Sequence, residues 1–220
     1  MINPNTLQYL KSLKRNNNKG WFEEHRPLFE EARNDFASFV EALITNIGSF
    51  DAAIAPLHVK ECVFRVNRDV RFSKDKTPYK VNMAASFSAG GKKATVAGYY
   101  FHLEPGRSFA GGGFYTPQPE QLVKIRQEID YNFSDWTKII REKTFQRHFA
   151  SGIEGNGSLV RPPKGYEVSN PGIEYLKMKG FIVTEAFSDV DLMNENAVAK
   201  VGASFKAMKP LIDFLNTAIS

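Results

Sequence analysis

The sequence predicts an α+β fold with an antiparallel-dominated central sheet and with N-terminal and C-terminal helices packed on it. Three observations predict this class. Apolar residues recur at three- and four-residue spacing near the N-terminus, they alternate with polar residues through the middle, and the helical spacing returns toward the C-terminus. The strand-like segments also follow one another with no helical run between them, which favours antiparallel pairing.

Two helices are expected before the sheet. Asn3 is a good N-cap and Pro4 suits the first helical position. The apolar face of this helix is formed by Leu7, Leu10 and Leu13. The polar run 16–20 interrupts the pattern, and a second helix with regular apolar spacing then ends at Gly48.

Four consecutive segments of the middle region are expected to be strands, and a later segment near 181–187 is expected to be the last one. The four segments lie near residues 61–72, 82–89, 95–104 and 108–115. The fourth contains Gly111, Gly112 and Gly113, which predict a weakened strand with close backbone packing or with room for a ligand.

Helical spacing returns after Pro117, first around Ile125 and Ile129 and then around Trp136. A final helix runs over 198–215, and Pro210 is expected to kink it. No repeat, low-complexity tract or linker interrupts the chain, so we expect one domain over residues 1–220.

Composition places the chain among globular proteins. It has 220 residues, 42% of them hydrophobic and 24% charged, and 18 are Phe. The single cysteine, Cys62, excludes an intrachain disulfide and a cysteine-based zinc site, and an inert core thiol is the simpler expectation. The N-terminal segment has no apolar stretch typical of a signal peptide, and no apolar run is long enough to span a bilayer. These features predict a cytoplasmic protein without a membrane partner.

The positive charge is concentrated in one part of the chain. The formal net charge is +5, and the segment 60–93 alone carries nine basic and three acidic residues, a net +6. The rest is therefore close to neutral. A local excess favours a patch or pocket for an anion over a protein that is basic on all sides.

Several motifs together resemble one known family. The longest is RVNRDVRFSKDKTPYK over 65–80, and it is accompanied by GYYFHL over 98–103, GGGFY over 111–115 and RPPKGY over 161–166. The chain resembles the bacterial domain of unknown function 2461 over nearly its whole length. The resemblance implies no activity and no catalytic residues, so the chemistry has to be inferred from the residues themselves.

The segment 65–80 is the strongest candidate for a ligand site. Guanidinium groups bind phosphate or carboxylate through two parallel hydrogen bonds and do not lose their charge. A strand that ends in a loop would present basic residues to such a ligand. The candidate ligand-binding residues are Arg65, Arg68, Arg71, Lys76, Tyr79 and Lys80. If the strand continues to Arg71, Arg68 lies on the face opposite Arg65 and Arg71.

Two residues are candidates for proton transfer. Asp69 lies among the arginines, and His102 precedes Glu104 by two residues on the same strand face. We expect Arg65, Asp69 and His102 to surround one concavity. The four histidines have no close spacing, so neither a metal site nor a cofactor is predicted.

Four interpretations of this segment remain open. The leading one is a site, binding or catalytic, for a small phosphorylated or carboxylated ligand. The second is a nucleic-acid-binding protein that uses the same basic patch, and the third is an interaction module that docks an acidic partner without catalysis. The fourth is a structural network in which Asp69 and Asp75 neutralise the arginines. Whether the protein is an enzyme, and its oligomeric state, are left undecided by the sequence.

Overall fold

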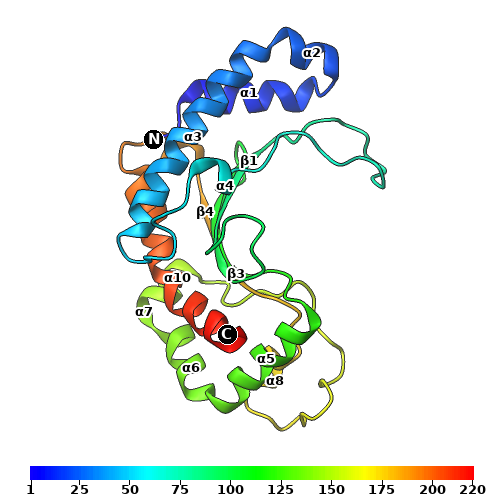
Figure 1. The fold of residues 1–220 in the computed structure, drawn as a ribbon, viewed down its shortest axis with the longest axis vertical. Coiled ribbons are helices and arrows are strands. Elements are labelled where there is room, and N and C mark those ends of the chain that lie inside the picture. Colours follow the sequence, from blue (N-terminus) through cyan, green and yellow to red (C-terminus); the bar gives the residue numbers. More distant parts are fainter. The chain divides into compact units, whose positions relative to one another are not determined.

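The computed structural model describes residues 1–220 and confirms the α+β class, with helices on both sides of the sheet in chain order (Figure 1). One antiparallel sheet contains all four strands in the order β1-β2-β3-β4. The strands are β1 (Met83–Phe87), β2 (Gly98–Leu103), β3 (Ser108–Phe114) and β4 (Phe181–Phe187). Three of the four predicted strand segments and the predicted last strand are therefore confirmed.

The chain divides into two compact units. The first unit contains Met1–Lys92, Tyr100–Ala110 and Ala186–Ala203. The second contains Lys93–Tyr99, Gly111–Glu185 and Ser204–Ser220. β2, β3 and β4 each contribute residues to both units. A single domain over 1–220 stays a prediction.

Asparagine side chains start the first helices. The side chain of Asn3 accepts a hydrogen bond from the backbone N–H of Asn5 and caps α1 (Pro4–Arg15). Asn18 caps α2 (Lys19–Glu24) in the same way, so the polar run that was expected only to break the helix also begins a new one. The long helix α3 (Arg26–Gly48) follows and lies beside α1 (Figure 1).

The strand predicted near 61–72 is wrong. Its first residues form the short helix α4 (Val59–Cys62), because the Glu61 carboxylate accepts a hydrogen bond from the backbone N–H of His58 at 2.8 Å and closes a helical turn. The chain after α4 is irregular and pairs only through two isolated bridges, Val63 with Ala85 and Asn67 with Tyr79. The alternation of apolar residues here reflects contacts on one side of a loop, and no continuous ladder forms.

The second unit is built around Trp136. Its helices are α5 (Pro119–Tyr131), α6 (Phe133–Arg141), α7 (Lys143–His148) and α8 (Ile173–Leu176). The indole of Trp136 is fully buried and contacts the rings of Tyr175, Phe181 and Phe214. The chain ends with α9 (Asp189–Met193) and α10 (Ala197–Ile219), and α10 continues through Pro210 as one helix.

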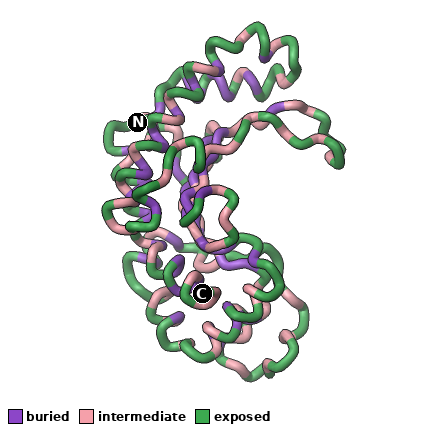
Figure 2. The backbone as a smooth tube through the Cα atoms, in the orientation of Figure 1, coloured by how far each residue is buried: buried purple, intermediate pink, exposed green.

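Two glycines of β3 allow close backbone approach, as one of the two sequence interpretations predicted. Gly113 has a φ of 118°, and a Cβ at this position would lie 2.1 Å from the carbonyl oxygen of Phe181 in β4. A Cβ at Gly112 would lie 2.2 Å from the sulfur of Met208 in α10. Figure 2 shows that buried residues follow this strand and its neighbours in the sheet.

Candidate functional site

A pocket of about 470 Å³, lined mostly by residues with polar or charged groups, opens beside β2 in the first unit. In β2 the odd-numbered residues from Tyr99 to Leu103 are buried and the even-numbered ones are half-buried, as alternation across a sheet requires. The even-numbered side chains Tyr100 and His102 therefore face the pocket. Its lining residues are Phe64, Arg68, Asp69, Lys80, Asn82, Ala84, Tyr100 and His102.

His102 lies at the centre of a hydrogen-bond chain. Its Nε2 is 3.3 Å from Oε2 of Glu104, and its Nδ1 is 3.2 Å from the hydroxyl of Tyr100. The amide Nδ2 of Asn82 is 3.4 Å from the same Nδ1. This pattern fits a neutral ring that donates from Nε2 to the carboxylate and accepts at Nδ1 from the phenol. The ring of Phe109 stacks on the imidazole, with centroids 4.9 Å apart, and fixes its orientation.

Burial controls the protonation of this chain. It lowers the pKa of His102 below its ordinary value, and the neighbouring Glu104 carboxylate opposes the shift without reversing it. Burial also raises the pKa of the Tyr100 phenol. Both groups are therefore neutral near pH 7, with a phenolic proton facing an imidazole nitrogen that is able to accept it.

Glu104 is itself held in place. Its carboxylate lies 3.6 Å from Lys14 and 3.9 Å from Arg107. The Ser108 hydroxyl accepts from the backbone N–H of Glu104 and donates to its carbonyl oxygen. Glu104 is therefore an oriented carboxylate behind His102, as in other sites where a carboxylate fixes the tautomer of a histidine.

Lys80 is a partly buried charge of the pocket that has no ion-pair partner. It is half-buried and forms no ion pair, and its ammonium lies 5.5 Å from the centre of the Phe64 ring. Burial lowers the pKa of Lys80, and the nearby positive charge of Arg65 lowers it further. An anion beside Lys80 would reverse both effects.

Arg68 is positioned by its own loop and keeps free donors. Its Nη1 donates to the Asp75 carboxylate and to the hydroxyl and carbonyl oxygens of Thr77. The other guanidinium nitrogens, Nε and Nη2, make no hydrogen bond within the protein, so they remain available to a ligand. Asp75 holds its charge firmly, because hydrogen bonds from Thr77 and Arg68 lower its pKa to about 2.

Asp69 also lines the pocket but is engaged by Arg71. The guanidinium of Arg71 donates from Nε at 3.0 Å and from Nη2 at 2.7 Å to its two carboxylate oxygens. These hydrogen bonds lower the pKa of Asp69. An aspartate is ordinarily a much weaker base than a histidine, and these hydrogen bonds weaken Asp69 further, so His102 is better suited to take a proton.

The structure brings some of the predicted residues together and separates others. Arg68, Asp69, Lys80 and His102 line the pocket, whereas the remaining candidates do not: Arg65, Arg71, Lys76 and Tyr79. No strand forms there, so the condition for placing Arg68 on the opposite strand face is not met. Burial still alternates, with Arg65, Asp69 and Arg71 exposed and Arg68 half-buried. The ligand-binding and catalytic roles stay predictions.

Tyr79 has a different position from the one expected. It is buried and stacks on Phe22, with ring centroids 3.9 Å apart. The side-chain amide of Asn17 makes two hydrogen bonds to the backbone of Tyr79. It accepts from the N–H of Tyr79 at 3.1 Å and donates to the carbonyl oxygen of Tyr79 at 2.9 Å. Lys76 in turn donates to the backbone carbonyl of Val70.

Four pocket residues were not among the predicted site residues, namely Phe64, Asn82, Ala84 and Tyr100. Asn82 directly precedes β1, and a polar residue at the start of a buried strand is the only signal that pointed to it. No group of three or more His, Cys, Asp or Glu side chains gathers closely enough to hold a metal ion. None of the helices has the length and apolar character needed to cross a membrane.

Comparison with known proteins identifies the family of the chain. A family model described as a conserved hypothetical protein, domain of unknown function 2461, matches residues 5–214. No curated protein and no solved structure matches the chain.

Proposed function

We propose a function from the geometry of the pocket alone, because the chain belongs to the conserved hypothetical protein family DUF2461 and that family provides no activity to transfer. The pocket binds a small phosphorylated or carboxylated molecule, and the Tyr100–His102–Glu104 chain exchanges a proton with it. The observation that carries the proposal is the presence of two cations with free donors beside a neutral phenol–imidazole–carboxylate chain.

Electrostatics supports an anionic ligand. Lys80 is partly desolvated without a counter-charge, and Arg68, which has free nitrogens, lines the same pocket. A bound phosphate or carboxylate would accept charge-assisted hydrogen bonds from both, each worth about 1.5–3 kcal/mol. The Asp69 carboxylate in the lining is balanced by Arg71, so it does not cancel this attraction.

The hydrogen-bond chain supports proton transfer at the bound ligand. Tyr100 donates to Nδ1 of His102, and a ligand group placed beside the phenol is able to pass a proton to it as the phenol passes its own to the imidazole. The Glu104 carboxylate then stabilises the imidazolium that forms. This assignment makes His102 the proton acceptor and Tyr100 the group that contacts the ligand.

The test is a thermal unfolding series with a fixed panel of anions: pyrophosphate, glucose 6-phosphate, AMP and citrate. At least one is expected to raise the melting temperature of the wild type by mass action. Lys80→Gln is expected to weaken binding of that anion about 10- to 100-fold, the range that corresponds to one charge-assisted hydrogen bond.

The matched control is Lys74→Gln, which removes the same charge from an exposed position outside the pocket. It is expected to leave the affinity within about twofold, because an exposed charge is screened by salt. Equal weakening by both variants, or no response of the wild type to any anion of the panel, would contradict the proposal.

One observation favours nucleic acid as a second candidate ligand. Phe72 is 96% exposed at the tip of the loop, and the guanidinium of Arg71 lies 5.9 Å from the centre of its ring. An exposed aromatic ring beside cations is suited to stacking on a base of a single strand. In that case an oligonucleotide would bind with strong salt dependence, Phe72→Ala would weaken it, and Lys80→Gln would matter no more than Lys74→Gln. If the ligand were an acidic protein partner, Lys80→Gln and Lys74→Gln would weaken its binding equally, and the protein would not bind oligonucleotides.

A further inference from the structure

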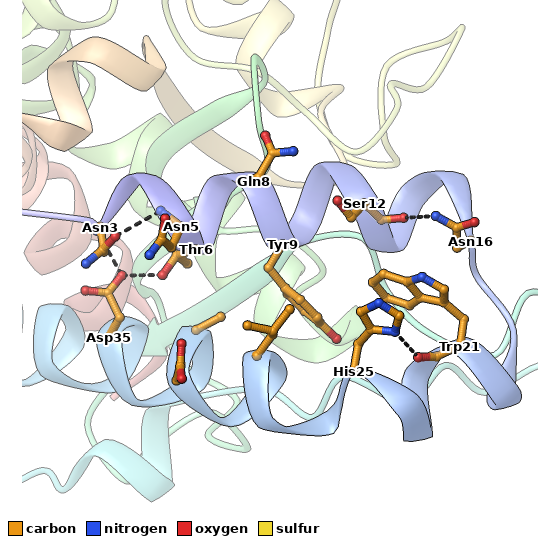
Figure 3. A pocket seen from close by; sticks show the side chains of 13 residues that line it. Asn3, Asn5, Thr6, Gln8, Tyr9, Ser12, Asn16, Trp21, His25 and Asp35 are labelled. Carbon is orange, nitrogen blue, oxygen red and sulfur yellow. Dashed lines mark hydrogen bonds between the residues drawn. The ribbon is translucent and has the colours of Figure 1, made fainter.

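A second pocket, of about 540 Å³, lies between α1 and α3 in the first unit (Figure 3). It shares no lining residue with the pocket beside β2. Residues of α1 spaced by three or four positions form one wall, and residues of α3 form the other, so the pocket is a groove along two neighbouring helices. Thr6 and Asp35 mark one end, and Trp21 and His25 mark the other.

The hydroxyl of Tyr9 is the unexplained group of this groove. Tyr9 is 4% exposed, and its oxygen has no hydrogen-bond partner. Figure 3 shows the ring reaching from α1 toward α3, between the two ends of the groove. Burial raises the pKa of the phenol, so the oxygen keeps its proton and offers a donor. Buried polar groups in proteins are nearly always paired, and an unpaired donor that lines a pocket points to a bound acceptor.

The end marked by Trp21 is aromatic and rigid. The imidazole of His25 stacks on the indole, with centroids 4.1 Å apart and planes at 14°. Its Nδ1 donates to the backbone carbonyl of Trp21 at 2.9 Å, which leaves Nε2 as a free acceptor. The Tyr9 ring lies 5.9 Å from the indole. Three aromatic rings with polar edges therefore surround one end of the groove.

The remaining lining combines polar side chains with the apolar Leu28 and Ala32, it contains the carboxylates of Glu31 and Asp35, and it has no basic residue other than His25. One carboxylate oxygen of Asp35 is already occupied, since it accepts from the backbone N–H of Asn3 and from the Thr6 hydroxyl. Exposed amides of Asn5 and Gln8 lie on the facing helix and offer both donors and acceptors. Such a lining does not favour an anion. A cation would meet only the exposed Glu31 and the half-buried Asp35, one oxygen of which is occupied.

We propose that this groove binds a neutral sugar. A sugar ring has an apolar face of C–H groups, which packs on an aromatic ring, and a rim of hydroxyls, which both donate and accept. The Tyr9 phenol donates to one ring or hydroxyl oxygen, and Nε2 of His25 and the free oxygen of Asp35 accept from hydroxyls. The amides of α1 bind the exposed side of the rim.

Fluorine NMR on protein labelled with 5-fluorotryptophan tests this directly, because the two tryptophans lie in different units. The titrants are glucose, N-acetylglucosamine, cellobiose and sucrose, each raised to millimolar concentration. At least one is expected to shift the Trp21 resonance in a saturable way and to leave the resonance of the fully buried Trp136 unchanged. Trp21→Phe assigns the two signals.

Tyr9→Phe removes only the phenolic oxygen and is expected to weaken binding of that saccharide about fivefold, the size of one neutral hydrogen bond. The variant should unfold at the same or a higher temperature, because it removes an unpaired buried hydroxyl. Tyr131→Phe is the control, since Tyr131 is 78% exposed and lies in the second unit. It should leave the affinity unchanged.

Three outcomes would overturn the proposal. They are the absence of any saccharide-dependent shift of Trp21, full saccharide affinity in the Tyr9→Phe variant, and a Trp21 shift caused by pyrophosphate or spermidine but by none of the four sugars. The second would show that the Tyr9 hydroxyl does not contact the sugar, and the third would assign the groove to ligands of another class.

Discussion

At the scale of single residues, His102 receives two opposing influences. Burial among Tyr100, Asn82 and Phe109 disfavours the charged ring, whereas Glu104 favours it. Burial is the larger effect, so the pKa of His102 is lowered. A ring that stays neutral at pH 7 is able to accept a proton, so the burial of His102 supports its proposed role as proton acceptor.

We expect the ring protons of His102 to titrate below 6.5, the ordinary value for histidine, when their NMR shifts are followed against pH. Glu104→Gln is expected to lower the pKa further, because it removes the charge that favours imidazolium. Glu24→Gln, at an exposed position on α2, is the control and should leave the titration unchanged. An upward shift in the Glu104→Gln variant would show that the carboxylate does not favour the imidazolium, and a wild-type pKa at or above 6.5 would show that burial is not the larger effect.

The same shift makes folding depend on pH in a defined direction. The unfolded chain binds the His102 proton more tightly than the folded one, so this contribution to stability is complete above pH 6.5 and is lost as the pH falls through the lower folded pKa. Urea unfolding at pH 7.5 and 5.5 is expected to show a smaller loss of stability in His102→Gln than in the wild type. A larger loss in the variant would contradict the assignment.

At the scale of elements, the irregular segment 63–82 supplies five of the pocket residues while forming only two isolated bridges. Its position depends on side chains elsewhere. The Asn17 amide holds the backbone of Tyr79, and the stacking of Phe22 on Tyr79 holds its ring. The neighbouring Lys80 is thereby fixed at the pocket.

Asn17→Ala is expected to destabilise this segment by about 1–3 kcal/mol, because it removes both hydrogen bonds to the backbone of Tyr79. Hydrogen exchange of the amides of residues 67–80 should become faster, and the anion that binds the wild type should bind more weakly. Asn34→Ala is the control at an exposed position on α3, with an expected change within about 0.5 kcal/mol. Unchanged exchange in Asn17→Ala would mean that aromatic stacking alone holds the segment.

The regular elements were predictable from the sequence because their signals are local. The cap at Asn3, the alternation in β2 and the spacing in α3 each depend on neighbours within a few residues. The strand near 61–72 was mispredicted because its alternation leads only to isolated bridges, and the facing backbone at Tyr79 is held by Asn17, which is 62 residues away. No period in the sequence records a contact of that kind.

The candidate site was partly predictable for the same reason. A local concentration of charge indicated the segment 65–80, and the spacing of His102 and Glu104 indicated one strand face. The sequence did not separate Arg68, which lines the pocket, from Arg65, which does not. That difference follows from the path of an irregular loop, and both the ion pairs of the structural-network interpretation and a polar pocket are present there.

At the scale of the whole molecule, the two compact units share three strands. When half of a strand loses its hydrogen bonds, the other half frays. The two units should therefore unfold together. The two tryptophans report on them separately, with Trp21 in the first unit and Trp136 in the second.

We expect the native 5-fluorotryptophan resonances of Trp21 and Trp136 to disappear at the same urea concentration. Coincident transitions are the usual sign of two-state unfolding. Addition of a ligand that binds the first unit should raise both midpoints equally. Separate midpoints would contradict the single domain and would show that the shared strands do not couple the units.

The adjacent glycines of β3 differ in how the protein would tolerate their replacement. An alanine at Gly112 would meet the end of the flexible Met208 side chain, so shortening that side chain would remove the closest contact and leave the Gly98 carbonyl oxygen, at 3.0 Å, as the nearest atom. An alanine at Gly113 would meet the main-chain oxygen of Phe181, and every amino acid at position 181 carries the same oxygen. Position 112 therefore has a compensating partner elsewhere in the chain, whereas position 113 has none, and side-chain changes at other positions would leave the amino acid at 113 restricted to glycine.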